Sequence, residues 1–171
     1  MATGRIILPA LAWVPLDGST GNHGPALDFV QSVAAAPSPR YARWAFDKDV
    51  DEHLCVVFRL PDDFVSGPVV KVDWYCITDT GDCVWGCRLA AQSEGDMQGV
   101  INIDCDAAVT TVQDATRSYL GQFALDLSAH NDNLAAGDIV MLVLFRDADN
   151  AADTVNYDAY FLGGVFEYTT A

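Results

Sequence analysis

The chain has 171 residues, of which 51% are hydrophobic and 19% charged, and its 24 acidic and 9 basic residues give a net charge of -15. This length and composition predict one folded domain with a full core and argue against disorder. The negative charge argues against a nucleic-acid binder, which needs positive charge for phosphates, and against an anionic membrane surface.

The first segment, GRIILPALAWVPL at residues 4–16, is apolar without a clear period. Pro9 and Pro15 exclude a helix interior and a central strand, so we expect an extended N-terminal arm. This arm is either an edge strand or tail packed on its own domain, or a contact for a partner. The partner-binding side chains would be the large apolar ones: Ile6, Ile7, Leu8, Leu11 and Trp13.

The apolar part of this segment is too short for a secretory signal, and Pro9 interrupts it. No apolar run is long enough to span a bilayer. We therefore expect a protein made in a cytosol and not exported by the general pathway. A loop of glycine and turn-forming residues ends the segment, which divides the chain into an arm and loop at 1–25 and a single domain at 26–171.

Residues 26–32 predict a short strand or a turn, and residues 40–47 predict a strand. The stretch 52–91 then holds three apolar runs with a period of two, enriched in β-branched and aromatic residues, which is typical of strands. The turn signal TDTGD between the second and third runs is short enough for a hairpin. Trp74 and Trp85 fall on the faces that we assign to the core.

Further strands are predicted at 101–105, 119–127, 139–145 and 157–168. Residues 107–113 predict a strand or an extended segment, and a helical turn is considered at 134–136. The run IVMLVLF at 139–145 is apolar on both faces, which predicts a central strand covered on both sides. Eight or nine strands without a long helical segment predict an all-β fold. We expect an antiparallel β-sandwich, jelly-roll-like, with an extended N-terminal arm.

Five cysteines lie inside apolar runs or strands: Cys55, Cys76, Cys83, Cys87 and Cys105. No C-x-x-C pair occurs, and Cys83 and Cys87 lie two pleats apart on one strand, too far to bridge each other. We expect buried free thiols. A disulfide between Cys76 and the strand of Cys83 and Cys87 is the alternative.

The sequence contains no nucleophile, zinc-hydrolase or phosphate-loop motif, which predicts a protein that is not an enzyme and has no cofactor. Four aspartates match positions of a calcium loop: Asp147, Asp149, Asp153 and Asp158. Ala151 and Ala152 stand where that loop needs an oxygen ligand and a turn glycine, which favours a solvated acidic turn without a metal. A sugar-binding surface would draw on four other aromatic side chains: Tyr75, Tyr157, Trp13 and Trp44.

From about Arg40 to its end, the chain carries short motifs made of scaffold and turn residues. These are Trp44-Ala45-Phe46-Asp47, Phe58-Arg59-Leu60-Pro61, Ser66-Gly67-Pro68-Val69, Val72-Asp73-Trp74, Asp82-Cys83-Val84-Trp85, Gly137-Asp138 and Arg146-Asp147-Ala148-Asp149. They resemble small β-sandwich virion proteins of tailed phages, similar to capsid decoration, or cement, proteins.

This resemblance implies a structural virion protein on the outside of a phage head, assembled in the host cytoplasm. It implies binding to the major capsid protein, stabilisation of the capsomers and a homotrimer, with no nucleic-acid or membrane partner. The alternative is a carbohydrate- or receptor-binding module of a phage fibre or tail.

Overall fold

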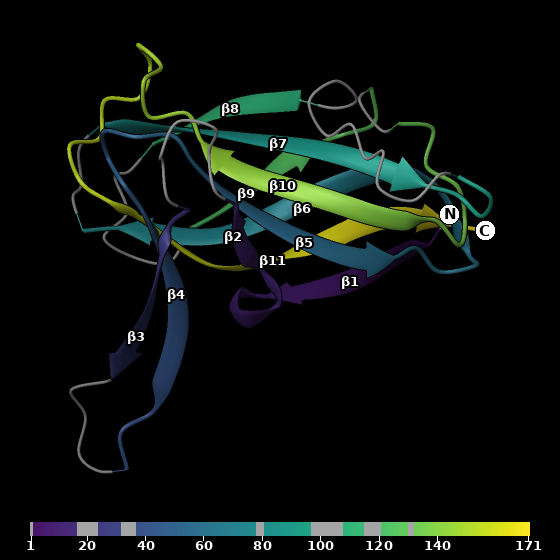
Figure 1. Ribbon diagram of the computed structural model, residues 1–171, viewed down its shortest axis with the longest axis horizontal. Coiled ribbons are helices and arrows are strands. Elements are labelled where there is room, and N and C mark those ends of the chain that lie inside the picture. Colours follow the sequence, from purple (N-terminus) through teal and green to yellow (C-terminus); the bar gives the residue numbers. More distant parts are fainter. Residues whose placement is uncertain are drawn as a thin grey trace.

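The structure is a computed structural model that describes residues 2–16, 24–31, 37–77, 81–96, 108–114, 121–129 and 132–171. These residues form two antiparallel sheets that face each other across the core (Figure 1). The antiparallel two-sheet β-sandwich of jelly-roll type predicted from the sequence is therefore confirmed.

Sheet A has six strands. Its order is β3 (Ala26–Gln31), β4 (Arg40–Phe46), β11 (Ala159–Thr170), β6 (Phe64–Cys76) and β9 (Gly121–Asp126), and β1 (Thr3–Pro9) also pairs with β11. Sheet B has five strands. Its order is β2 (Val14–Leu16), β5 (Glu52–Arg59), β10 (Ile139–Arg146), β7 (Asp82–Gln92) and β8 (Ala108–Asp114).

The predicted strands that lie within the described residues are found, but one predicted connection is wrong. Strand β6 belongs to sheet A and β7 to sheet B, so these two strands do not pair as a hairpin. Residues 134–136 form no helical turn. The strand predicted at 101–105 lies outside the described residues.

The N-terminal segment is extended, as predicted, and it packs on its own domain. Strand β1 pairs with β11, the 3-10 turn η1 (Ala10–Ala12) follows, and β2 pairs with β5 in the other sheet. Leu8 and Trp13 are each only 2% exposed. The described part of residues 1–25 therefore contributes strands to the sandwich, in agreement with the first of the two alternatives for the arm.

The core contains the tryptophans of both sheets. Trp74 of β6 and Trp85 of β7 are buried, as predicted, and their rings meet edge to face with centroids 5.6 Å apart. The indole Nε1 of Trp44 donates a hydrogen bond to the carbonyl oxygen of Ala10 at 2.8 Å. A buried tryptophan N–H usually has such a partner, and this bond holds η1 against sheet A.

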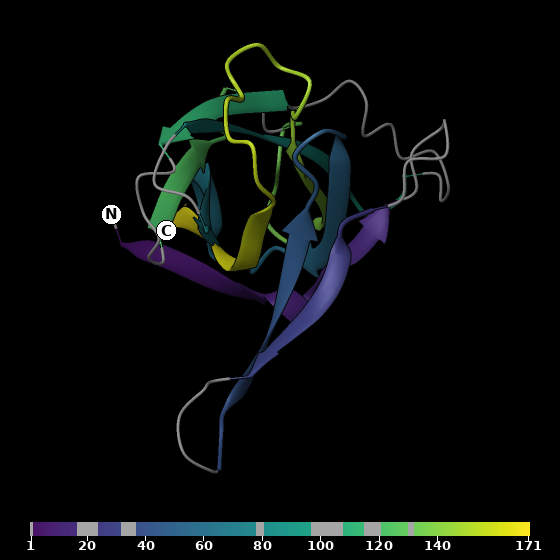
Figure 2. The ribbon, with the colours of Figure 1, turned by 90° about the vertical axis from the view of Figure 1, so that its left-hand side faces the viewer.

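Strands β3 and β4 extend away from the sandwich as a two-stranded ribbon (Figure 2). The register explains this shape, because only the last three residues of β4, Trp44 to Phe46, pair with β11. The preceding residues, from Arg40, pair with β3 alone. Among the described residues, no helix is long and apolar enough to cross a membrane.

Candidate functional site

The aspartates that match positions of a calcium loop are not gathered around one point, because Asp153 points into the core. Its side chain is 1% exposed and forms a paired ion bridge with Arg146, which is fully buried. The Arg146 guanidinium also donates to the carbonyl oxygens of Val155 and Tyr157, at 3.0 and 2.9 Å. Burial lowers the pKa of Arg146, but the hydrogen bond to Asp153, followed by the charge interactions with Cys83, Asp153 and Cys76, raises it, and the net result is a raised pKa.

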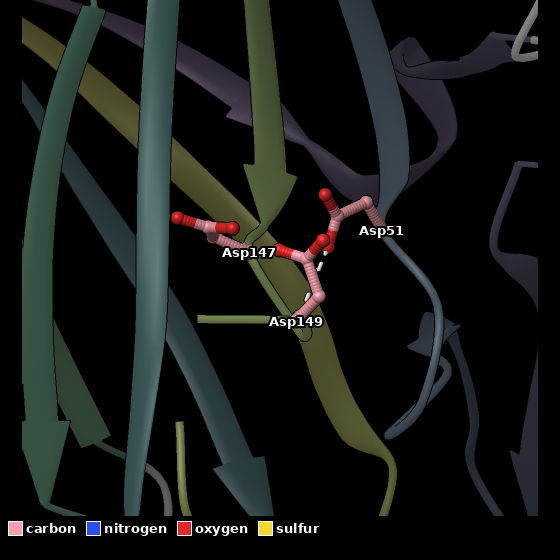
Figure 3. A group of neighbouring side chains, drawn as sticks. All are labelled: Asp51, Asp147 and Asp149. Atoms are coloured by element: carbon pink, nitrogen blue, oxygen red, sulfur yellow. Dashed lines mark hydrogen bonds between the residues drawn. The ribbon is translucent and has the colours of Figure 1, made fainter. Parts of the chain in front are cut away.

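Two other aspartates of that loop meet Asp51 at the end of sheet B (Figure 3). One carboxylate oxygen each from Asp51, Asp147 and Asp149 lies within 4.8 Å of the others. The charge of Asp51, followed by contact with Asp147, raises the pKa of Asp149. Calcium needs about six to eight oxygens. Asp51 already accepts a hydrogen bond from the backbone N–H of Ala148 at 2.7 Å, so this carboxylate holds the turn that follows β10.

The four described cysteines are buried and form no disulfide: Cys55, Cys76, Cys83 and Cys87. Burial raises the pKa of the Cys55, Cys83 and Cys87 thiols, which lowers their reactivity. The expected buried thiols are thus confirmed for these four residues. Cys105 lies outside the described residues.

One carboxyl group has a pKa suited to acid–base chemistry. Burial raises the pKa of Glu52 from its ordinary value of 4.5 to about 7, although a backbone hydrogen bond from Asp47 opposes the change. That bond, 2.6 Å from the Asp47 nitrogen to Oε2, closes the turn between β4 and β5. The geometry therefore gives Glu52 a structural role.

A cavity of about 390 Å³ opens beside sheet B. Its lining is mainly polar: Arg59, Gln92, Ser93, Glu94, Gly95, Asp96, Gly137 and Ile139. Asp96 accepts the backbone N–H of Ser93, and the buried Asp138 accepts the Ser93 hydroxyl, each at 2.8 Å. These contacts hold the turn together, and no aromatic side chain lines the cavity.

The outer face of sheet A carries a cluster of aromatic side chains, here called the tyrosine platform. It consists of Tyr41 and Arg43 on β4, Tyr160 on β11 and Tyr75 on β6. Tyr160 lies directly opposite Tyr75 in the β-ladder, and their ring centroids are 5.0 Å apart. Alternation along each strand forms this face: Arg43, Tyr75 and Tyr160 each adjoin a buried core residue of their own strand, and Tyr41 adjoins the partly buried Ala42.

Arg43 is the centre of the platform. Its guanidinium carbon lies 3.7 Å from the ring centroid of Tyr160, and its Nη1 donates to the Tyr75 hydroxyl. Two further bonds, at 2.9 and 2.7 Å, reach a carboxylate oxygen of Asp28 on β3. Four strands thus fix these side chains in one arrangement, a preorganisation that lowers the entropic cost of binding.

Hydrogen bonds affect the protonation of the platform and add polar groups beside it. Burial, followed by a hydrogen bond with Tyr41, raises the pKa of Tyr75 to about 12, so its hydroxyl stays protonated. Towards β9, the amide of Gln122 donates to Asp73 at 2.7 Å. The face therefore offers aromatic rings beside neutral and charged hydrogen-bonding groups, a combination that suits a neutral ligand rich in hydroxyl groups.

The sequence named one of these residues, Tyr75, and missed Tyr41, Arg43 and Tyr160. Of the other predicted sugar-binding residues, Trp13 and Trp44 are core side chains, 2% and 6% exposed.

Tyr157 is 47% exposed but lies on the loop after β10, outside the platform. Alternation on each strand could have indicated the missed side chains. The sequence did not indicate which strands would be neighbours.

The predicted partner-binding residues of the arm divide into two groups. Leu8 and Trp13 lie in the core, and Ile6 is partly buried against it. Ile7 and Leu11 are 67% and 64% exposed, so they alone of the five remain fully available to a partner.

No protein-family model matches the chain, and no curated protein matches it in sequence. Solved structures do match its fold. An arabinose-bound α-L-arabinofuranosidase shares 13% identity over 95% of this chain, with a TM-score of 0.52. This chain spans only 24% of that enzyme.

A second match has nearly the same length as this chain. The family 11 carbohydrate-binding module from Clostridium thermocellum, in complex with a β-1,3-1,4-mixed-linked tetrasaccharide, shares 10% identity. The match covers 97% of this chain and 96% of the module, with a TM-score of 0.50. At such identities these matches establish the class of fold, a β-sandwich like that of carbohydrate-binding modules.

Proposed function

We propose that the protein is a carbohydrate-binding module and that a neutral glycan lies across the tyrosine platform. The observation that carries this proposal is the fixed cluster of Tyr41, Arg43, Tyr75 and Tyr160 on an open sheet face. Aromatic rings pack against the C–H faces of sugar rings, while hydroxyl and guanidinium groups bind their hydroxyls. The likeness in fold to a module bound to a tetrasaccharide supports the same function.

The charge of the chain favours neutral over acidic glycans. A net charge of -15 repels polyanions, and the positive charge of Arg43 is already balanced by Asp28. We therefore expect binding to uncharged polysaccharides and none to polyuronates.

The test is affinity electrophoresis, followed by calorimetry, with soluble mixed-linked β-glucan, xylan, β-1,3-glucan and polygalacturonate as probes. Tyr41 and Tyr157 are 45% and 47% exposed, which makes them a matched pair. Replacing Tyr41 by Ala should weaken glycan binding about tenfold, whereas Tyr157→Ala should leave it unchanged. Absence of binding to every probe, or equal losses in both variants, would contradict the proposal.

A structural role on a phage head is a second proposal, favoured by a different surface. Ile7, Leu11 and Val14 are between 56% and 67% exposed along the N-terminal segment. Exposed apolar side chains close together in the chain suit a protein partner, here the major capsid protein, with this protein acting as a decoration protein.

Co-sedimentation with expanded empty phage heads tests this second proposal. The double variant Ile7→Ser, Leu11→Ser should no longer sediment with heads, and Val57→Ser, at an exposed position of β5, should still do so. If the unmodified protein stays in the supernatant, the structural role is excluded for those heads.

A further inference from the structure

Strand β3 is an open edge of sheet A. In the part of the chain that the structure describes, it pairs with β4 and with no other strand. In native proteins, a lysine, a proline or a bulge usually prevents an edge strand from pairing with another chain. The sequence ALDFVQ at 26–31 has none of these, and its single charge, Asp28, is neutralised by Arg43 at 2.7 Å.

One face of this strand is apolar and exposed. Phe29 and Leu27 are 56% and 42% exposed and lie on the same face, since they are two residues apart. The ribbon of β3 and β4 stands away from the sandwich (Figure 2), which agrees with the exposure of both side chains. An unprotected edge with an exposed aromatic side chain is a template for strand pairing with another chain.

The charge distribution points to a second copy of this chain as the other strand. Residues 24–46 hold two arginines and one aspartate, a local charge of +1, which leaves -16 for the rest of the chain. Two copies repel each other across most of their surfaces, and that repulsion is smallest where the ribbons meet.

We propose that β3 pairs antiparallel with β3 of a second copy, about a two-fold axis at Phe29. This register sets the two Phe29 side chains opposite each other, while Asp28 lies opposite Val30 of the second copy. Leu27 lies opposite Gln31 of the second copy and diagonal to its Phe29. Four apolar side chains then share one face of a continuous sheet.

Neighbouring registers are less favourable. An axis at Asp28 would place the two aspartates opposite each other, and like charges there are destabilising. An axis between Asp28 and Phe29 would bring the polar face of one strand onto the apolar face of the other.

Sedimentation equilibrium of the whole chain over a range of protein and salt concentrations tests the dimer. The expected result is a reversible dimer that tightens with salt, because salt screens the repulsion between the acidic bodies. Replacing Phe29 by Lys sets two like charges opposite each other and removes two buried rings, so it should weaken the dimer about a hundredfold or more. Val57→Lys, at a residue 55% exposed on β5, is the control and should leave the dimer intact.

A cysteine cross-link checks the register itself. Phe29→Cys places two thiols opposite each other across an antiparallel pair, within reach of a disulfide. Mild oxidation should give a covalent dimer for Phe29→Cys and none for Val57→Cys. A monomer under all conditions, a trimer, or a dimer indifferent to Phe29→Lys would each overturn the proposal. The outcome is separate from glycan binding, which Tyr41→Ala and Tyr157→Ala report.

Discussion

At the scale of single residues, the pair of Arg146 and Asp153 places two opposite charges in the core, where their side chains are 0% and 1% exposed. Replacing Arg146 by Met should destabilise the fold by about 3–5 kcal/mol, because the Asp153 carboxylate would stay buried without its partner. Urea unfolding measures this loss. The double variant Arg146→Met, Asp153→Leu should lose less than the single one, and equal losses would show that the buried charge is not the cause.

Glu52 makes stability depend on pH. Its pKa of about 7 in the folded state lies above its ordinary 4.5, so between these values the folded state holds a proton that the unfolded state has lost. This contribution to the free energy of unfolding is fully present below pH 4.5 and is lost as the pH rises through 7.

The melting temperature of Glu52→Gln should therefore equal that of the unmodified protein near pH 4.5 and be higher above pH 7. Thermal unfolding across this range checks the prediction. Glu94→Gln, at an exposed turn, is the control, and its difference in melting temperature from the unmodified protein should not change with pH in this way. A constant difference at every pH would contradict the assignment.

Residue types and alternation predicted which apolar side chains are buried, but not which charged side chains are. Trp74, Trp85 and the four described cysteines are buried as expected, because period two assigns a face on each strand. The inward turn of Asp153 was not predicted, since it depends on Arg146 being drawn into the core. Burial of a charge is decided by its partner in space, which spacing along the chain does not reveal.

At the scale of elements, the bulge of β11 controls how β1 is attached. The register shifts between Phe161 and Gly163, and Gly163 has a φ of 136°. A Cβ at Gly163 would lie 3.1 Å from the carbonyl oxygen of Leu8 in β1. The bulge therefore requires glycine both for its backbone conformation and for the approach of β1.

Gly163→Ala should lower stability by about 1–3 kcal/mol and reduce the hydrogen-exchange protection of β1. Gly95→Ala is a matched control: its φ of 102° is equally positive, but no atom lies within 4 Å of a Cβ there. Loss of β1 protection in both variants would mean that backbone strain alone, without the contact, is responsible.

Strand positions were predictable, and strand partners were not. The alternation of β5, β6 and β7 is clear in the sequence, yet consecutive strands fall in different sheets. A short turn is compatible with a hairpin or with a crossing between sheets, and tertiary packing selects one of them. The tyrosine platform depends on this choice, because β4, β11 and β6 bring its residues together from distant parts of the chain.

At the scale of the whole molecule, the N-terminal segment joins the two sheets. Deleting residues 1–16 would remove β1 and β2 with the buried Leu8 and Trp13. Loss of a buried tryptophan alone costs about 3–5 kcal/mol, against a total of about 5–15. We expect the truncated chain to lack cooperative thermal unfolding. A sharp transition would mean that the remaining strands suffice. The variant Ile7→Ser, Leu11→Ser should stay folded.

The pairing of β1 with β11 also fixes where the polypeptide enters and leaves the fold. Thr3 lies opposite Thr169, and the backbone N–H of Thr170 donates to the carbonyl oxygen of Ala2 at 3.0 Å. A longer chain continuing from both sides would therefore depart from a single point on the surface (Figure 1). Such a module can be inserted into a surface loop of a host protein while the two ends of that loop stay close together.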